Sequence, residues 1–181
     1  MNAQAWDMLE AAGAAKIEHP GGTLAAHLGR TSDLLAAWGA RPALVSAGLC
    51  HAFYGTDGFA VALLGLGRRD ELVAVIGAEA EALVYFYASC DRGASYSQLV
   101  AGDGVFVDRF TGTHLRPGLP ARRDFAELTA ANELDLATVS PDFHARHGTG
   151  LHALFARWRP LLSSAARAHC DNVLGAAPTG P

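Results

Sequence analysis

The spacing of apolar residues along the chain predicts a series of helices. In residues 24–38 leucine recurs at positions 24, 28 and 35, the spacing of one helix face. Thr23 precedes this segment and belongs to a residue type that commonly caps a helix N-terminus. Residues 42–52 are apolar around most of their circumference and begin with a proline, which suits a first helical turn. We expect this second segment to be a central, buried helix.

The remaining pattern is also mostly helical, with one exception. Residues 104–118 alternate β-forming residues around a Thr-Gly turn, which predicts a small surface hairpin. The sequence therefore predicts a mainly α-helical single domain over residues 1–175, with a loop and hairpin insertion at 92–124 that is a candidate lid, and a disordered tail at 176–181. Further helices are expected at residues 4–15, 59–67, 71–77, 78–91, 122–137, 140–158 and 160–175.

Composition narrows the class of protein. Half of the residues are hydrophobic and 18% are charged, as in a globular domain. The net charge of -4 and the lack of a basic run argue against a nucleic-acid partner. Apolar stretches end well before the roughly 20 residues that a membrane span needs. The N-terminal segment has no signal-peptide pattern, so we expect a cytoplasmic protein.

Three polar side chains lie on the inward faces of three predicted helices. His27 lies on the same face of its predicted helix as the leucines, and His51 lies near the end of the most apolar helix. Asp91 lies in the last turn of a third helix, on its inward face. Two histidines and one carboxylate around a cation are typical of a mononuclear non-haem iron centre or of a zinc-like hydrolytic centre. The alternative is that each histidine is a hydrogen-bonded core residue and that Asp91 caps the following loop.

Residues 18–58 carry a family resemblance. The stretch "EHPGGTLAAHLGRTSDLLAAWGARPALVSAGLCHAFYGTDG" resembles the opening of HD-domain metalloproteins, a helical superfamily of phosphohydrolases and some oxygenases. Their pattern is a histidine on one helix, a His-Asp pair ending the next, and a distant aspartate. His27 matches the first histidine, His51 the second and Asp91 the final aspartate, whereas Ala52 stands in place of the defining aspartate.

The resemblance implies an HD-like helical bundle holding one divalent metal, Fe, Mn or Zn, on His27, His51 and Asp91. Because alanine cannot bind a metal, Ala52 argues against a dinuclear site. The same half of the chain also looks like a small bacterial domain family of unknown function, which implies no activity.

Further polar residues are candidates for substrate contact or catalysis. His19 lies in a glycine-rich loop before the His27 helix, and Tyr54 lies about one turn beyond His51. Asn132 interrupts an apolar helix, where a buried amide needs partners. The alternatives are a solvated loop residue for His19 and a phenol at the edge of the core for Tyr54. Arg92 is expected to be exposed.

These observations favour an enzyme acting on a small-molecule substrate. Few lysines lie near the motif, which argues against a phosphate-rich substrate, so an iron oxygenase is slightly favoured over a zinc or manganese hydrolase or lyase. The alternative is a metal-free module that binds a small ligand in a degenerate HD site. We expect no nucleic-acid or membrane partner and retain a homodimer as an option. The sequence determines neither the substrate nor the metal.

Overall fold

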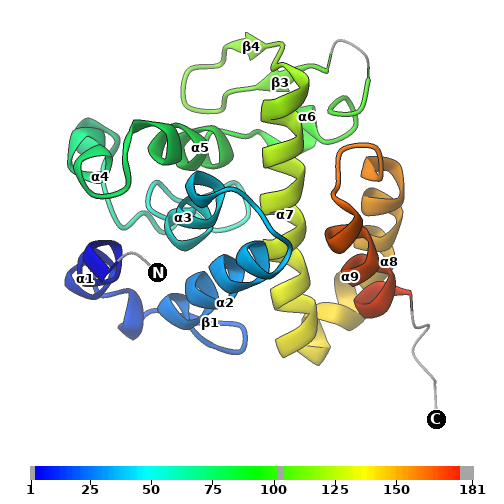
Figure 1. The fold of residues 1–181 in the computed structure, drawn as a ribbon, viewed down its shortest axis with the longest axis horizontal. Coiled ribbons are helices and arrows are strands. Elements are labelled where there is room, and N and C mark those ends of the chain that lie inside the picture. The colour runs from blue at the N-terminus through cyan, green and yellow to red at the C-terminus, as the bar shows by residue number, and fades with distance from the viewer. Residues whose placement is uncertain (1–2, 102–103, 176–181) are drawn as a thin grey trace.

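The computed structural model describes residues 3–101 and 104–175. Figure 1 shows that this part of the chain is mainly helical. Its helices are α1 (Ala3–Ala11), α2 (Leu24–Ala37), α3 (Pro42–Cys50), α4 (Arg69–Ile76), α5 (Ala78–Ala88), α6 (Arg92–Ser95), α7 (Leu119–Val139), α8 (Pro141–Trp158) and α9 (Ser164–Leu174). Short 3-10 turns, η1 (Ala14–Lys16) and η2 (Leu66–Arg68), follow α1 and precede α4.

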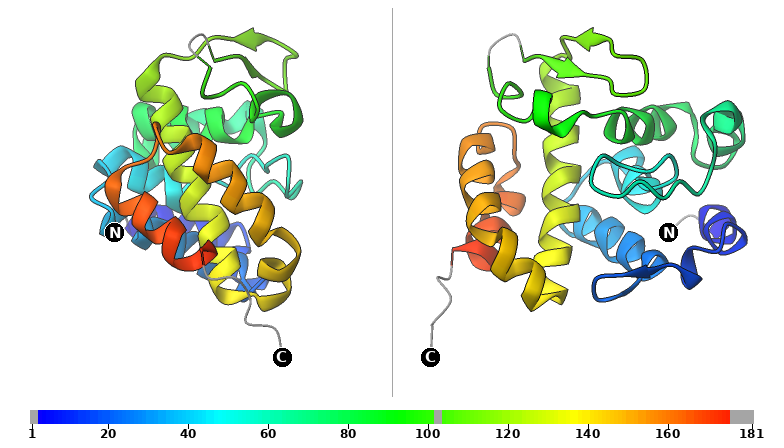
Figure 2. Two further views of the ribbon diagram at one scale, coloured as in Figure 1. Left: turned by 90° about the vertical axis from the view of Figure 1, so that its right-hand side faces the viewer. Right: turned by 180° about the vertical axis from the view of Figure 1, so that it is seen from behind.

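Helix α7 is the centre of the fold. It contacts α2, α3 and α5 on one side and α8 and α9 on the other, and the views in Figures 1 and 2 show it standing between these two groups. Its 21 residues include a long run that is buried, from Phe125 to Ala137. One apolar cluster surrounds α7, α8 and α9, and a second fills the space among α1 to α5. Polar residues of α7 therefore lie where the two groups of helices meet.

Helices α2 and α3 pack closely because a glycine lies at their crossing. A side chain at Gly48 would meet Leu35 and the backbone of Ser32. The Ser32 hydroxyl donates to the Val45 carbonyl at 3.0 Å, which fixes the register of the two helices. This packing brings the inward faces of α2 and α3, with their histidines, toward α7.

Two small antiparallel hairpins accompany the helices. Strands β3 (Phe106–Val107) and β4 (His114–Leu115) form the hairpin that the sequence predicts in residues 104–118. Strands β1 (Glu18–His19) and β2 (Gly22–Thr23) form a second hairpin, which the sequence pattern does not predict. Gly21 in its turn and Gly22 at the start of β2 both have positive φ, and a side chain at Gly21 would overlap Val139 of α7. The tight contact with α7 positions the strand that carries His19.

The mainly α-helical fold class with a small β excursion is confirmed. The Thr23 cap is also confirmed, since its hydroxyl accepts from the Ala26 amide at 3.3 Å. The predicted helix over residues 59–67 is wrong: the segment is irregular, Leu64 N donates to the Phe53 carbonyl, and only the 3-10 turn η2 begins at its end. The predicted tail at 176–181 lies outside the described residues. Across residues 3–101 and 104–175, no helix combines the length and hydrophobicity needed to cross a membrane.

Candidate functional site

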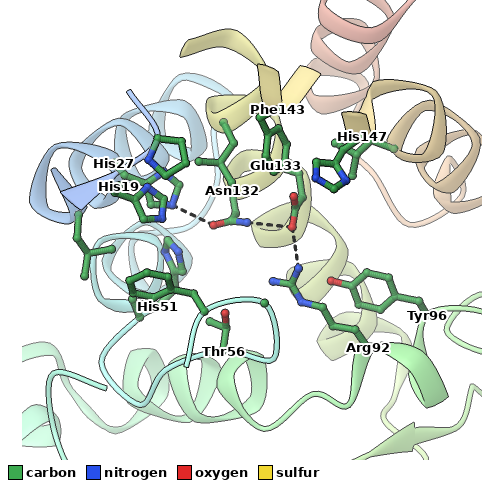
Figure 3. Close-up of a pocket in the computed structure, with 17 residues that line it drawn as sticks. His19, His27, His51, Thr56, Arg92, Tyr96, Asn132, Glu133, Phe143 and His147 are labelled. Atoms are coloured by element: carbon green, nitrogen blue, oxygen red, sulfur yellow. Dashed lines mark hydrogen bonds and ion pairs between the residues drawn. The ribbon is translucent and has the colours of Figure 1, made fainter. Parts of the chain in front are cut away.

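A cavity of about 420 Å³ lies between the β1–β2 hairpin, α2 and the end of α3 on one side and α6, α7 and α8 on the other. Figure 3 shows the imidazoles of His19, His27 and His51 on one side of it and Asn132 in the middle. The far side carries Glu133, Arg92 and Tyr96 together with a fourth imidazole, that of His147. Apolar side chains, among them Leu136, Phe143 and Leu151, complete the wall. The volume lies within the range of small-molecule sites, which is about 300–1,000 Å³.

His27 is held by a carboxylate from α7. Its Nδ1 donates to Asp135 Oδ2 at 2.6 Å, and both side chains are almost fully buried. Arg30 binds the same carboxylate through two bonds, Nε to Oδ1 at 2.6 Å and Nη2 to Oδ2 at 3.0 Å. Burial alone would raise the pKa of Asp135, but the bonds from His27 and Arg30 outweigh it and hold that pKa below its ordinary value. The ring of His27 is thereby fixed in orientation.

A continuous polar chain runs from His27 along α7. His27 Nε2 lies 3.0 Å from Asn132 Oδ1, which is within hydrogen-bond distance. Asn132 Nδ2 donates to Glu133 Oε1 at 3.1 Å, which sets the orientation of the amide because a carboxylate can only accept. Arg92 Nη1 donates to the same Glu133 oxygen at 2.9 Å. The chain ends at Arg92, on the far side of the cavity from the histidines.

His51 lies beside His27, with the two ring planes nearly perpendicular and the ring centroids 5.3 Å apart. Its Nδ1 donates to the carbonyl of Gly48 at 2.7 Å, so a neutral ring carries its lone pair on Nε2. Burial, and then the neighbouring His27, lower the pKa of His51 to about 3. His51 is therefore an uncharged acceptor at neutral pH.

His19 adds a third imidazole from the hairpin. Its ring stacks on His27 with centroids 4.3 Å apart, and Phe59 contacts it edge-on at 5.3 Å. Burial, and then His27, lower the pKa of His19 to about 4. Its Nδ1 is buried and has no hydrogen-bond partner among the described residues.

The structure brings together four of the six residues singled out from the sequence. His19, His27, His51 and Asn132 line one cavity. Asp91 does not line it: its Oδ1 accepts from the Ala94 amide at 2.9 Å and caps α6, which is the alternative role that the sequence left open.

Tyr54 does not line the cavity either. Its hydroxyl donates to Glu81 Oε1 at 2.9 Å, and Arg69 binds the same carboxylate. The phenol therefore belongs to a partly buried ion-pair cluster between the end of α3 and α4–α5.

The metal implied by the resemblance does not fit the side chains as they are arranged. Within residues 3–101 and 104–175, no three or more His, Cys, Asp or Glu side chains form a group that could hold a metal ion. Ala52 contributes only a methyl group to the wall, and Asn132 bonds His27 at Nε2. His19 stacks on His27, an arrangement in which the two rings do not converge on a common point.

Sequence reasoning missed Asp135 and the place of Arg92. Asp135 lies one helical turn after Asn132, so a search for polar residues on the same face of α7 would have found it. Arg92 was expected to be exposed, but it is partly buried and lines the cavity, because the Asp57 carboxylate holds its backbone amide at 2.9 Å. Because that contact joins residues far apart in the sequence, no pattern in the neighbouring residues predicts it.

Comparison with known proteins gives one finding. Residues 8–92 match a family model described as a domain of unknown function, DUF6817, in line with the expected small family of unknown function. Neither the curated proteins nor the solved structures contain a match. The matched region contains the three histidines and Arg92, whereas Asn132, Glu133 and Asp135 of α7 lie beyond it.

Proposed function

We propose that this protein binds a small polar molecule of no net charge in the cavity between the histidines and Arg92, and that it does so without a resident metal. The proposal rests on two buried polar atoms of the cavity wall that have no hydrogen-bond partner in the part of the chain that the structure describes. Among the described residues only four buried side-chain polar atoms have no hydrogen-bond partner, and two of them, His19 Nδ1 and Tyr96 Oη, belong to side chains that line this cavity.

Unpaired buried polar atoms are costly, roughly 1–3 kcal/mol each, and folded proteins contain few of them. Two on the wall of one cavity indicate that something else supplies their partners. A polar ligand that spans the cavity would bond both atoms and offset their desolvation. Neutral His51 would accept a hydrogen bond from it at Nε2, and the unpaired Nδ1 of His19 would donate or accept a second one.

The charges around the cavity favour a ligand without net charge. Asp135 is paired with Arg30 and His27, and Arg92 is paired with Glu133. A ligand with a single charge would meet no unpaired counter-ion and would lose its hydration on entry. A neutral or zwitterionic molecule avoids that cost.

Thermal unfolding with a panel of small molecules tests this proposal. The panel contains amino acids, amides, polyols and nucleosides, each at millimolar concentration. We expect at least one class to raise the Tm of the wild type and to have no effect on Asn132→Leu, which removes both polar atoms of the central amide. Asn172→Leu, at an exposed position of α9, is the control and should respond as the wild type does. Equal stabilisation of all three proteins, or of none, would contradict the proposal.

A metal-dependent enzyme is the second candidate, and one observation favours it. Nδ1 of both His27 and His51 donates to an oxygen, which is the usual arrangement behind histidines that bind a metal through Nε2. A distant relationship to HD-domain proteins, and oxygenase, hydrolase or lyase chemistry, would belong to this candidate. The missing carboxylate ligands and the stacked His19 count against it.

Elemental analysis separates the two candidates. Protein purified without chelators should contain far less than one Fe, Mn or Zn atom per chain. None of these ions should raise the Tm of the wild type more than that of a His51→Ala variant. About one metal atom per chain, lost in a folded His51→Ala variant, would establish the second candidate and exclude the first.

A further inference from the structure

The side of the cavity opposite His19, His27 and His51 carries a partly buried ion pair, two polar atoms of which have no partner within the described protein. Arg92 Nη1 donates to Glu133 Oε1, which already accepts from Asn132. In the part of the chain that the structure describes, Glu133 Oε2 and Arg92 Nε take part in no hydrogen bond. A free acceptor and a free donor therefore lie on one ion pair, and both residues line the cavity.

The guanidinium of Arg92 is held in place from several directions. The Arg92 backbone amide is tied to Asp57. Gly58 leaves room for the guanidinium, since a β-carbon there would lie 3.1 Å from Nη1. Arg92 Nη2 also makes a long bond of 3.4 Å to the Tyr87 hydroxyl. A guanidinium fixed in this way is suited to bind a carboxylate through its planar donors.

Tyr96 completes this polar end. Its ring lies 5.8 Å from the Arg92 guanidinium carbon, and Figure 3 shows its hydroxyl directed toward that side chain. The hydroxyl is buried and has no partner among the described residues. An additional acceptor placed between Tyr96 and Arg92 would satisfy both groups.

We propose that Arg92, Glu133 and Tyr96 form a recognition site for the head group of an α-amino acid or a similarly small zwitterion. The ligand carboxylate accepts from Arg92 and from the Tyr96 hydroxyl, and the ligand ammonium donates to Glu133 Oε2. This inference rests on the proposed binding function of the cavity and specifies the chemical class of its ligand.

The pairing of opposite charges explains why both ligand groups are needed. A carboxylate alone would bind Arg92 but face Glu133, and an ammonium alone would bind Glu133 but face Arg92. Like charges at short distance in a partly buried site repel strongly. A zwitterion presents each charge to its complement. The rest of the ligand would extend toward Asn132 and the imidazoles, along the apolar wall that includes Leu136 and Phe143.

Calorimetric titration with matched ligands tests the inference. The twenty common amino acids are first ranked by their effect on the Tm of the wild type. The best one is then compared with the same molecule lacking its amino group and with the same molecule lacking its carboxylate. We expect the amino acid to bind at least tenfold more tightly than either.

Two variants assign this preference to the site. Glu133→Gln should lose most of its preference for the amino acid over the deaminated acid. The substitution removes the carboxylate that pairs with the ligand ammonium, and it also removes the repulsion between Glu133 and a ligand that carries only a carboxylate. Tyr96→Phe should weaken amino-acid binding at least threefold without lowering the Tm of the free protein, since it deletes an unpaired hydroxyl. Glu127→Gln is the control: Glu127 lies on the same helix, is equally buried and bonds Ser163 outside the cavity, so the preference should persist.

The possible failures are distinguishable. Equal affinity of the wild type for the amino acid and its deaminated acid would overturn the zwitterion inference, as would an unchanged preference in Glu133→Gln. If no amino acid binds but an amide or nucleoside of the wider panel does, the inference fails and the cavity keeps its binding function. If nothing in either panel binds, both proposals fail.

Discussion

His27 and Asp135 lie 108 positions apart in the chain, and their side chains meet in a hydrogen bond of 2.6 Å that is almost wholly shielded from solvent. This bond joins α2, which belongs to the N-terminal group of helices, to α7 at the centre of the fold. It also fixes the ring on which His19 stacks and against which His51 packs. The imidazole side of the cavity therefore depends on one contact between the two groups of helices.

Replacement of Asp135 should destabilise the protein substantially. Asp135→Ala leaves His27 and Arg30 without their shared acceptor, and breaking a buried charged pair typically costs about 3–5 kcal/mol. We expect a loss of about 3 kcal/mol in the free energy of unfolding, measured by urea denaturation. Asp33→Ala, at an exposed position of the same helix as His27, should change it by less than about 0.5 kcal/mol. Similar effects of the two substitutions would refute the structural role of the His27–Asp135 bond.

The stability of the protein should fall as the pH drops below the ordinary pKa of histidine. In the folded state the pKa of His51 is about 3 and that of His19 about 4, whereas both are near 6.5 in the unfolded chain. Between these values the unfolded chain binds protons that the folded protein does not, so the free energy of unfolding decreases as the pH falls. His51 alone should account for about 2 kcal/mol between pH 7 and pH 5.

Urea denaturation of the wild type and of His51→Asn at these two pH values measures this effect. The variant should lose about 2 kcal/mol less stability on acidification than the wild type, the rest of the loss coming from His19, whereas His152→Asn, at an exposed position of α8, should follow the wild type. A wild-type stability that is unchanged between pH 7 and pH 5 would mean that His51 is not held neutral by burial.

Close packing of α2 against α3 should not tolerate a side chain at position 48. Gly48→Ala would press a methyl group against Leu35 and should cost about 1–3 kcal/mol of stability. Gly150→Ala is the matched substitution, because Gly150 also lies within a helix but has open space around it, and it should raise stability by up to about 1 kcal/mol. Thermal unfolding of both variants tests whether their Tm values change in opposite directions. A loss of stability in Gly150→Ala equal to that in Gly48→Ala would argue against helix packing as the cause.

The role of Asp91 can be separated from metal binding by two substitutions. As the N-cap of α6, Asp91 is replaceable by asparagine, which caps almost as well, so Asp91→Asn should change stability by less than about 0.5 kcal/mol. Asp91→Ala should cost about 1 kcal/mol. Neither variant should change the affinity for a ligand by more than about twofold when measured by calorimetry. A bound metal that is lost in Asp91→Asn would show instead that this carboxylate is a ligand.

Much of the fold could be predicted from the sequence because helix periodicity and caps are local signals. The leucine spacing before Trp38 and the hydroxyl of Thr23 each specify an element without reference to the rest of the chain. The β1–β2 hairpin was missed because it depends on Gly21 meeting Val139 of α7, a contact between residues distant in sequence.

The candidate site could be predicted only in part for the same reason. The inward faces of α2 and α3 follow from their apolar patterns, so His27 and His51 were found together. Asp91 was misplaced because helical spacing does not show where a helix ends: α5 stops at Ala88, and the carboxylate turns to cap the next helix. The partner of His27 proved to be Asp135, which only the position of α7 relative to α2 could reveal.

The central claim is that the three imidazoles and Asn132 form the wall of a ligand site, and its most direct test is nitrogen NMR of protein labelled with ¹⁵N in the histidine rings. Spectra are recorded with and without the panel molecule that most stabilises the wild type, and signals are assigned from single His→Asn variants. We predict that the ring nitrogens of His19, His27 and His51 shift on binding, while those of His114 and His152, which are exposed and outside the cavity, do not. Shifts confined to His114 and His152, or a stabilising ligand that leaves the rings of His19, His27 and His51 unchanged, would contradict the account.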